Sequence, residues 1–149
     1  MESAFQYIKE NDGDDTEESY PYKAENETCR FNPKNVGATD TGYVKLPQGD
    51  EPALMDAVYN IGPISIGMDA AMQDFQFYHK GVYSNYGCSA VALDHGVLAI
   101  GYGKLNGVPY WLVKNSWGDK WGIKGFFMIA RFVGNMCGIA TDPSYPTMT

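Results

Sequence analysis

Apolar residues recur every three or four positions in two stretches of the chain, which is the spacing of one face of a helix. These stretches are residues 3–11 and 52–60, and the pattern predicts two helices. Asp12-Gly13 ends the first, and Pro52 lies near the first turn of the second, where proline is well tolerated. Because no capping residue precedes the first helix, we expect further residues upstream of it.

A second pattern, of alternating or continuous apolar residues, predicts β-strands and dominates the chain from Asp94 onward. Asn106-Gly107 separates two of these runs, and this dipeptide is a strong signal for a two-residue hairpin turn. Residues 14–18 and 20–22 are polar or contain proline, which predicts a loop. The predicted strands are residues 41–46, 64–66, 96–102, 108–114 and 126–130.

Composition and charge exclude two classes of partner. The chain of 149 residues is 44% hydrophobic and 14% aromatic, which is typical of a packed core. Its net charge is -7, with 13 acidic and 5 basic residues in residues 1–60, and this disfavours a nucleic-acid partner. No apolar run reaches the roughly 18 residues of a membrane helix. Residues 1–5 lack the basic and apolar parts of a secretory signal, so we expect no signal peptide here.

The three cysteines, Cys29, Cys88 and Cys137, lie far apart, without the paired spacing of a zinc site. Either all three are free thiols of a cytosolic protein, or two form a disulfide and the third pairs with a group outside the chain. Asn26-Glu-Thr28 is a glycosylation sequon at Asn26, and it favours the second alternative. We expect no cofactor and no metal.

A histidine and an asparagine at two strand ends are the candidate catalytic residues. His95 lies where one strand of the Asn106-Gly107 hairpin begins, and Asn115 lies where the other ends. Side chains at the same end of paired strands can lie within hydrogen-bond reach. A histidine oriented by an amide is half of a Cys-His-Asn nucleophilic system. His79 has no such partner in the sequence, and we expect it to be a surface or structural residue.

At these residues the chain resembles the papain family of cysteine peptidases, and most closely its cathepsin L branch. The resemblance covers essentially the whole chain and implies an α+β papain-like fold. Residues 46–149 would form the β-rich right-hand domain, and residues 1–45 a remnant of the helical left-hand domain. The motifs that carry the resemblance, in the family's order, are Ala4-Phe-Gln-Tyr7, Glu18-Ser-Tyr-Pro-Tyr22, Gly62-Pro-Ile64, Asp94-His-Gly96, Tyr110-Trp-Leu-Val-Lys-Asn-Ser-Trp-Gly118, Trp121-Gly122 and Cys137-Gly-Ile-Ala140 through Ser144-Tyr-Pro146.

The resemblance assigns three catalytic roles. His95 would be the base that holds the nucleophile as a thiolate, because an adjacent imidazolium lowers the pKa of a thiol. Asn115 would accept from the second ring N–H and fix the tautomer of the imidazole. Trp117 would cover that hydrogen bond and exclude water from it.

The family's nucleophile motif and its oxyanion-stabilising glutamine are absent from this chain. The family separation of Cys and His would place the nucleophile roughly 40 residues before Met1. Cys29 lacks the surrounding pattern of the nucleophile and resembles the family cysteine that pairs with a residue of the missing segment. Cys88 and Cys137 resemble a bridged pair. A metal site built on Cys88 and His95 has too few partners.

Three residues resemble those around the family's pocket for the substrate residue two positions before the scissile bond. They are Gly67, Leu93 and Asp142, of which the first two suit an apolar side chain. Asp142 departs from the apolar residue usual in cathepsin L. If its carboxylate points inward it favours a basic side chain, and if it points to solvent it has no effect.

The implied function is that of a cathepsin L-like cysteine endopeptidase, present here as a partial chain that we expect to be inactive alone. Its implied partners are peptide and protein substrates and cystatin-type or propeptide inhibitors, and the full-length form would be lysosomal or secreted. Two alternatives are a non-catalytic homologue that binds peptide or inhibitor, and a silicatein-like protein in which Ser replaces the nucleophile and condenses silica.

Overall fold

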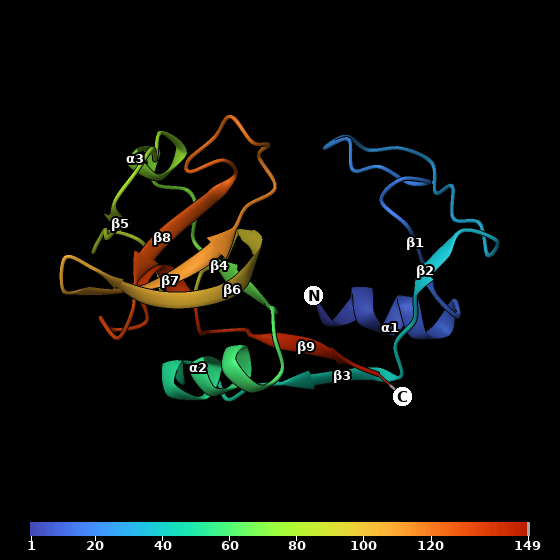
Figure 1. Ribbon diagram of the computed structural model, residues 1–149, viewed down its shortest axis with the longest axis horizontal. Helices are drawn as coiled ribbons and strands as arrows, with labels where there is room; N and C mark the ends of the chain where they lie inside the picture. Colours follow the sequence, from blue (N-terminus) through green and yellow to red (C-terminus); the bar gives the residue numbers. More distant parts are fainter. Residues whose placement is uncertain (149) are drawn as a thin grey trace. The chain divides into compact units, whose positions relative to one another are not determined.

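The computed structural model describes residues 1–148 and divides the chain into two units (Figure 1). The first unit is Met1–Val44 together with the end of the chain from Pro146, and the second is Lys45–Tyr145. The predicted division after residue 45 placed all of residues 46–149 in the second domain, whereas here the end of the chain from Pro146 belongs to the first unit. The helices are α1 (Glu2–Glu10), α2 (Glu51–Asn60), α3 (Gln73–Gln76) and the 3-10 turn η1 (Met136–Gly138). The strands are β1 (Asp14–Asp15), β2 (Val36–Ala38), β3 (Gly42–Lys45), β4 (Ile64–Met68), β5 (Val82–Tyr83), β6 (His95–Leu105), β7 (Val108–Lys114), β8 (Phe126–Ala130) and β9 (Ser144–Thr147).

Both predicted helices are present, and their ends lie within one residue of the predicted ones. In α2 the Asp50 carboxylate accepts from the Ala53 backbone N–H at 2.8 Å and caps the helix, with Pro52 in the first turn. Its apolar face buries Leu54 and Val58 and packs on β4 and β6. No residue of α1 is buried, so that helix keeps an amphipathic face without a full apolar covering.

The predicted hairpin also forms, and its strand β6 is longer than expected. Asn106 and Gly107 have φ angles of 51° and 83°, both in the left-handed region that a two-residue hairpin turn requires. The ladder therefore continues to the pair Leu105 and Val108 at the tip, beyond the predicted end at residue 102.

The predicted loop over residues 14–18 is wrong at its start. Asp14–Asp15 is the short strand β1, which pairs antiparallel with β2. Two acidic residues show neither alternation nor high strand propensity, so the sequence pattern could not reveal this strand. The elements α3 and β9 were not predicted either, because each has only four residues and is too short to show a periodic pattern.

One sheet has the strand order β3-β9-β4-β6-β7-β8-β5. β4, β6, β7 and β8 pair antiparallel in turn, and β5 is parallel to β8. Alternate residues of the central strands point to the core, as the two-residue period requires. The fully buried examples on two neighbouring strands are Trp111 and Val113 of β7 and Phe127 and Ile129 of β8.

A buried carboxylate joins α2 to the sheet. Glu51 is 5% exposed, and its Oε1 accepts from the Trp111 indole N–H at 2.9 Å and from the Phe132 backbone N–H at 3.0 Å. Glu51→Leu leaves the buried Trp111 indole N–H and the part-buried Phe132 N–H unpaired, so we expect it to lower the free energy of unfolding by about 2 kcal/mol. Glu51→Gln is the matched control, because its amide oxygen accepts both bonds, and it is expected to cost less than about 1 kcal/mol. Urea denaturation of the three proteins measures this, and equal losses in both variants would contradict the assignment.

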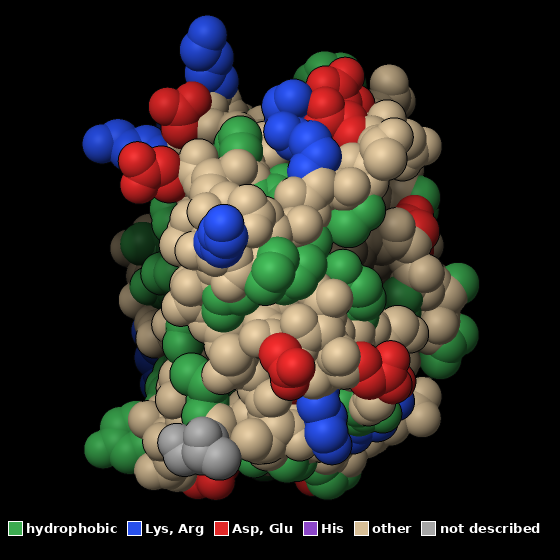
Figure 2. Space-filling model, turned by 90° about the vertical axis from the view of Figure 1, so that its right-hand side faces the viewer, with side chains coloured by type: hydrophobic (Ala, Val, Ile, Leu, Met, Phe, Trp, Pro, Cys, Tyr) green, Lys and Arg blue, Asp and Glu red, His purple; other side chains and the backbone are tan. Residues whose placement is uncertain are grey.

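The acidic first unit is partly ion-paired at its surface. The Glu27 carboxylate contacts Lys23 Nζ and Arg30 Nη2, each at 2.8 Å, and the hydrogen bond from Lys23 is the main cause that lowers the pKa of Glu27. Figure 2 shows acidic and basic side chains next to one another on one face of the molecule. The excess of acidic residues in the first unit is therefore typical of a solvated surface. Within residues 1–148, no helix is both long and apolar enough to cross a membrane.

Candidate active site

The candidate histidine and asparagine are in contact. His95 is the first residue of β6 and Asn115 directly follows β7, so the pairing of these strands brings them to the same end of the hairpin. The ring Nε2 of His95 lies 2.8 Å from Oδ1 of Asn115. Asn115 is only 7% exposed, so this hydrogen bond lies at the edge of the core, where it is stronger than in water.

A second hydrogen bond shows which atom of the His95–Asn115 pair donates the proton and which accepts it. Oδ1 of Asn115 also accepts from the Ser116 backbone N–H at 2.8 Å. Because a backbone N–H is always a donor, the atom facing it must be the amide oxygen, and Nε2 of His95 must then donate. In the neutral ring the lone pair is therefore on Nδ1. Within residues 1–148, Nδ1 makes no hydrogen bond, so it is available as a proton acceptor.

Trp117 covers the imidazole. The centroids of the His95 and Trp117 rings are 4.9 Å apart, with 36° between the planes. The indole is held from behind by Phe75 at 5.6 Å and by Trp121 at 5.1 Å, both edge to face. Although Trp117 itself is 39% exposed, this aromatic support fixes its orientation against His95.

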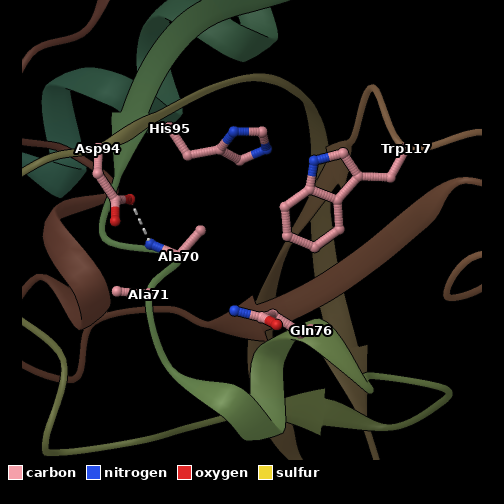
Figure 3. A pocket seen from close by; sticks show the side chains of 6 residues that line it. All are labelled: Ala70, Ala71, Gln76, Asp94, His95 and Trp117. Carbon is pink, nitrogen blue, oxygen red and sulfur yellow. Dashed lines mark hydrogen bonds between the residues drawn. The ribbon is translucent and has the colours of Figure 1, made fainter. Parts of the chain in front are cut away.

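A groove of about 420 Å³ opens beside the histidine. Figure 3 shows the His95 and Trp117 rings on one side of it and the side chain of Gln76, from the end of α3, on another. The groove is lined by Ala70, Ala71, Gln76, Asp94, His95 and Trp117.

Two carboxylates fix the backbone of Ala70 and Ala71, which line one wall of this groove. Asp94 Oδ1 accepts from the Ala70 N–H at 2.8 Å, as the dashed line in Figure 3 marks. Asp69 Oδ1 accepts from the Ala71 N–H at 3.0 Å, and its Oδ2 accepts from the Ser89 N–H at 2.6 Å. The sequence did not reveal these groove residues, and the one available signal was the position of Asp94 directly before the candidate histidine.

Comparison with known proteins decides the family. Residues 1–147 match the model of the papain family cysteine proteases. The chain belongs to the papain family. It is 58% identical over 147 residues to a cathepsin L-like peptidase of Aedes aegypti, which covers 98% of this chain and 43% of that protein. It is 53% identical over 152 residues to cathepsin L2 of Homo sapiens, covering 99% of this chain and 46% of that protein.

A solved structure of the papain family confirms the predicted fold. Digestive procathepsin L 3 of the Tenebrio molitor larval midgut matches with a TM-score of 0.94 at 45% identity, over 99% of this chain and 48% of that chain. The papain-like α+β fold and the cathepsin L resemblance are thus confirmed. The chain spans less than half the length of these relatives.

The cysteines of this papain-family chain divide into a pair and a free thiol. Cys88 and Cys137 form a disulfide, and Cys29 is exposed and free. The Phe31 backbone amide and then the Tyr7 hydroxyl, whose oxygen lies 3.8 Å away, lower the pKa of Cys29. Within the described residues, no three His, Cys, Asp or Glu side chains are grouped so that they could hold a metal ion.

The residues that resemble the family's substrate pocket lie outside the groove lining. Gly67 and Leu93 are neighbours, because a Cβ at Gly67 would lie 2.8 Å from Cδ1 of Leu93. Asp142 pairs with Lys45 at 3.0 Å, and the two side chains are 37% and 51% exposed. The carboxylate of Asp142 therefore already has a cationic partner.

Proposed function

We propose that this chain supplies the general base of a cathepsin L-like cysteine endopeptidase, and that its nucleophile comes from a segment outside the chain. The hydrogen bond from His95 Nε2 to Asn115 Oδ1 carries this proposal, because it leaves Nδ1 with a lone pair beside an open groove. A histidine held in this way can hold and move a proton at one defined atom.

The steps follow from this arrangement. Nδ1 of His95 takes the proton of the incoming thiol, and the resulting thiolate attacks the peptide carbonyl. The same Nδ1–H then protonates the leaving amine, which gives a thioester and a free amine. Water, deprotonated by Nδ1, hydrolyses the thioester and releases the acid. Asn115 keeps the ring in one plane throughout, and Trp117 limits access of water to their hydrogen bond.

We further propose that the chain alone does not hydrolyse peptides, because the thiol is not part of it. In the longer protein the partners would be peptide substrates and cystatin-type inhibitors. The relatives from Tenebrio molitor are solved as procathepsins, which supports a propeptide as a further partner. The full-length form would be lysosomal or secreted. The peptidase and cathepsin names of the relatives favour proteolysis over a binding-only or silicatein-like role.

The test is a gain of function. The chain is produced alone and as a fusion behind the nucleophile-bearing segment of the Aedes aegypti relative, and both are assayed with a fluorogenic peptide. The fusion should hydrolyse the peptide and the chain alone should not. A fusion in which the nucleophilic Cys is replaced by Ala is the control and should be inactive. Equal activity of the chain alone, or a folded fusion without activity, would refute the proposal.

The ion pair of Asp142 bears on substrate preference. Because Lys45 neutralises the Asp142 carboxylate and both groups are partly exposed, we expect Asp142→Ala to change the Arg/Leu preference by less than about threefold, which corresponds to about 0.7 kcal/mol. The measurement compares kcat/KM of the fusion on peptides with Arg or Leu two positions before the scissile bond. Lys45→Met, which leaves the carboxylate in place, is the matched variant and should raise the relative rate with Arg. A much larger loss of Arg cleavage in Asp142→Ala would mean that the carboxylate acts directly in the pocket.

A further inference from the structure

An exposed loop of the first unit contains the one Asn-X-Ser/Thr tripeptide of the sequence, Asn26-Glu-Thr28. Residues 21–30 around it are all exposed and lie outside helices and strands. Such a position is where an asparagine can carry a bulky, hydrated group without displacing the core.

The loop is held in place by the neighbours of Asn26. The Glu27 carboxylate binds Lys23 and Arg30 at 2.8 Å each. The Arg30 guanidinium lies 4.8 Å from the centroid of the Tyr20 ring, and the Arg30 backbone N–H donates to the Tyr20 hydroxyl at 3.2 Å. These contacts order the loop on both sides of the tripeptide.

The side chains of Asn26 and Thr28 take no part in this network, and within residues 1–148 they make no hydrogen bond. The amide nitrogen of Asn26, to which a glycan would be attached, therefore makes no hydrogen bond that stabilises the described part of the fold. A modification of that nitrogen breaks no bond that stabilises the loop.

Asn26 also borders a hollow of about 430 Å³ on the surface of this unit, together with Tyr20 and Tyr22. The Tyr22 side chain is 66% exposed. An exposed ring has an apolar face, and a sugar residue attached at Asn26 finds both space and a surface to pack on in this hollow.

We propose that Asn26 carries an N-linked oligosaccharide. The co-reactant is a lipid pyrophosphate-linked oligosaccharide, from which the membrane-bound transferase of the secretory route transfers the sugar. The amide nitrogen of Asn26 forms a bond to the anomeric carbon of the sugar, and the bond from that carbon to the pyrophosphate oxygen breaks. The lipid pyrophosphate leaves with the electron pair, and the amide proton passes to a base of the transferase. The hydroxyl of Thr28 completes the recognition motif.

The test reads mass and not peptidase activity, so a failure of the proposed peptidase function leaves it unaffected. The chain is expressed in insect cells behind a secretory leader, and whole-cell and medium fractions are treated with peptide N-glycosidase. Because the transfer occurs as the chain enters the secretory route, the readout does not depend on secretion of a folded product. We expect a loss of mass on treatment and the conversion of Asn26 to Asp in the peptide map.

Asn26→Gln and Thr28→Ala should both abolish the mass shift. Glu27→Gln removes the negative charge between Lys23 and Arg30 but keeps the tripeptide, and Thr28→Ser keeps the hydroxyl, so both should retain the shift. Translocated chain with unmodified Asn26, or a shift that persists in Asn26→Gln, would overturn the proposal.

Discussion

Replacing His95 by alanine in the active fusion is expected to lower kcat/KM by at least about 10³-fold. The expectation follows from the loss of both roles of the ring, which holds the nucleophile as a thiolate and transfers its proton to the leaving amine. Asn115→Ala should cause a smaller loss, because the ring keeps both nitrogens but no longer has one tautomer fixed by the 2.8 Å hydrogen bond. The measurement is kcat/KM on a fluorogenic peptide.

The chain offers its own control for this experiment. His79 is the second of the two histidines and is exposed, so His79→Ala should leave kcat/KM within about twofold of the unmodified fusion. If His95→Ala kept most of the activity, or if both histidine variants lost it equally, the assignment of the base to His95 would be wrong.

Phe75→Ala is expected to lower the free energy of unfolding by about 3 to 5 kcal/mol, the usual cost of removing a fully buried phenylalanine ring. The Phe75 side chain is 0% exposed and contacts four other rings, whose centroids lie 5.0 to 5.6 Å away. These rings belong to Tyr83, Trp117, Trp121 and Phe127. Urea denaturation followed by tryptophan fluorescence measures the loss.

The same variant should disturb the candidate site, because Phe75 supports the indole that covers His95. Phe77 is two residues further along and 76% exposed, so Phe77→Ala should change stability by less than about 0.5 kcal/mol. Equal losses in Phe75→Ala and Phe77→Ala would show that the aromatic cluster does not carry the expected packing energy.

Two tyrosines at the edge of this cluster act as hydrogen-bond donors. Burial raises the pKa of Tyr78, whose hydroxyl donates to the Gly81 carbonyl at 2.6 Å. Burial and then the neighbouring Asp74 raise the pKa of Tyr83, whose hydroxyl donates to that carboxylate at 2.8 Å. Both phenols therefore keep their protons well above neutral pH, and the donor bonds around α3 persist over that range.

The elements with a clear periodic pattern could be predicted from the sequence, and so could the meeting of His95 with Asn115. A two-residue turn at Asn106-Gly107 sets the register of the strands next to it, and a single register shift between Ala99 and Gly101 still leaves the two outer ends at the same end of the hairpin. This pairing needs no information from distant parts of the chain.

The groove wall could not be predicted in the same way. Ala70 and Ala71 are placed by hydrogen bonds to Asp94 and Asp69, and Asp69 also binds the loop at Ser89. These segments are about 20 residues apart in the sequence, and no periodic pattern relates them. Short elements such as β1 were missed for a similar reason, since pairing with β2 and not intrinsic propensity makes Asp14–Asp15 a strand.

The protonation of the His95 ring tests the central claim most directly. In the ¹⁵N-labelled chain, long-range ¹H–¹⁵N correlation at a pH where the imidazole is neutral distinguishes the two tautomers. We predict that His95 carries its proton on Nε2 alone, and that Asn115→Ala abolishes this preference while exposed His79 is unchanged. A neutral His95 ring with its proton on Nδ1 would contradict the account, because no lone pair would then remain on the nitrogen that is to receive the thiol proton.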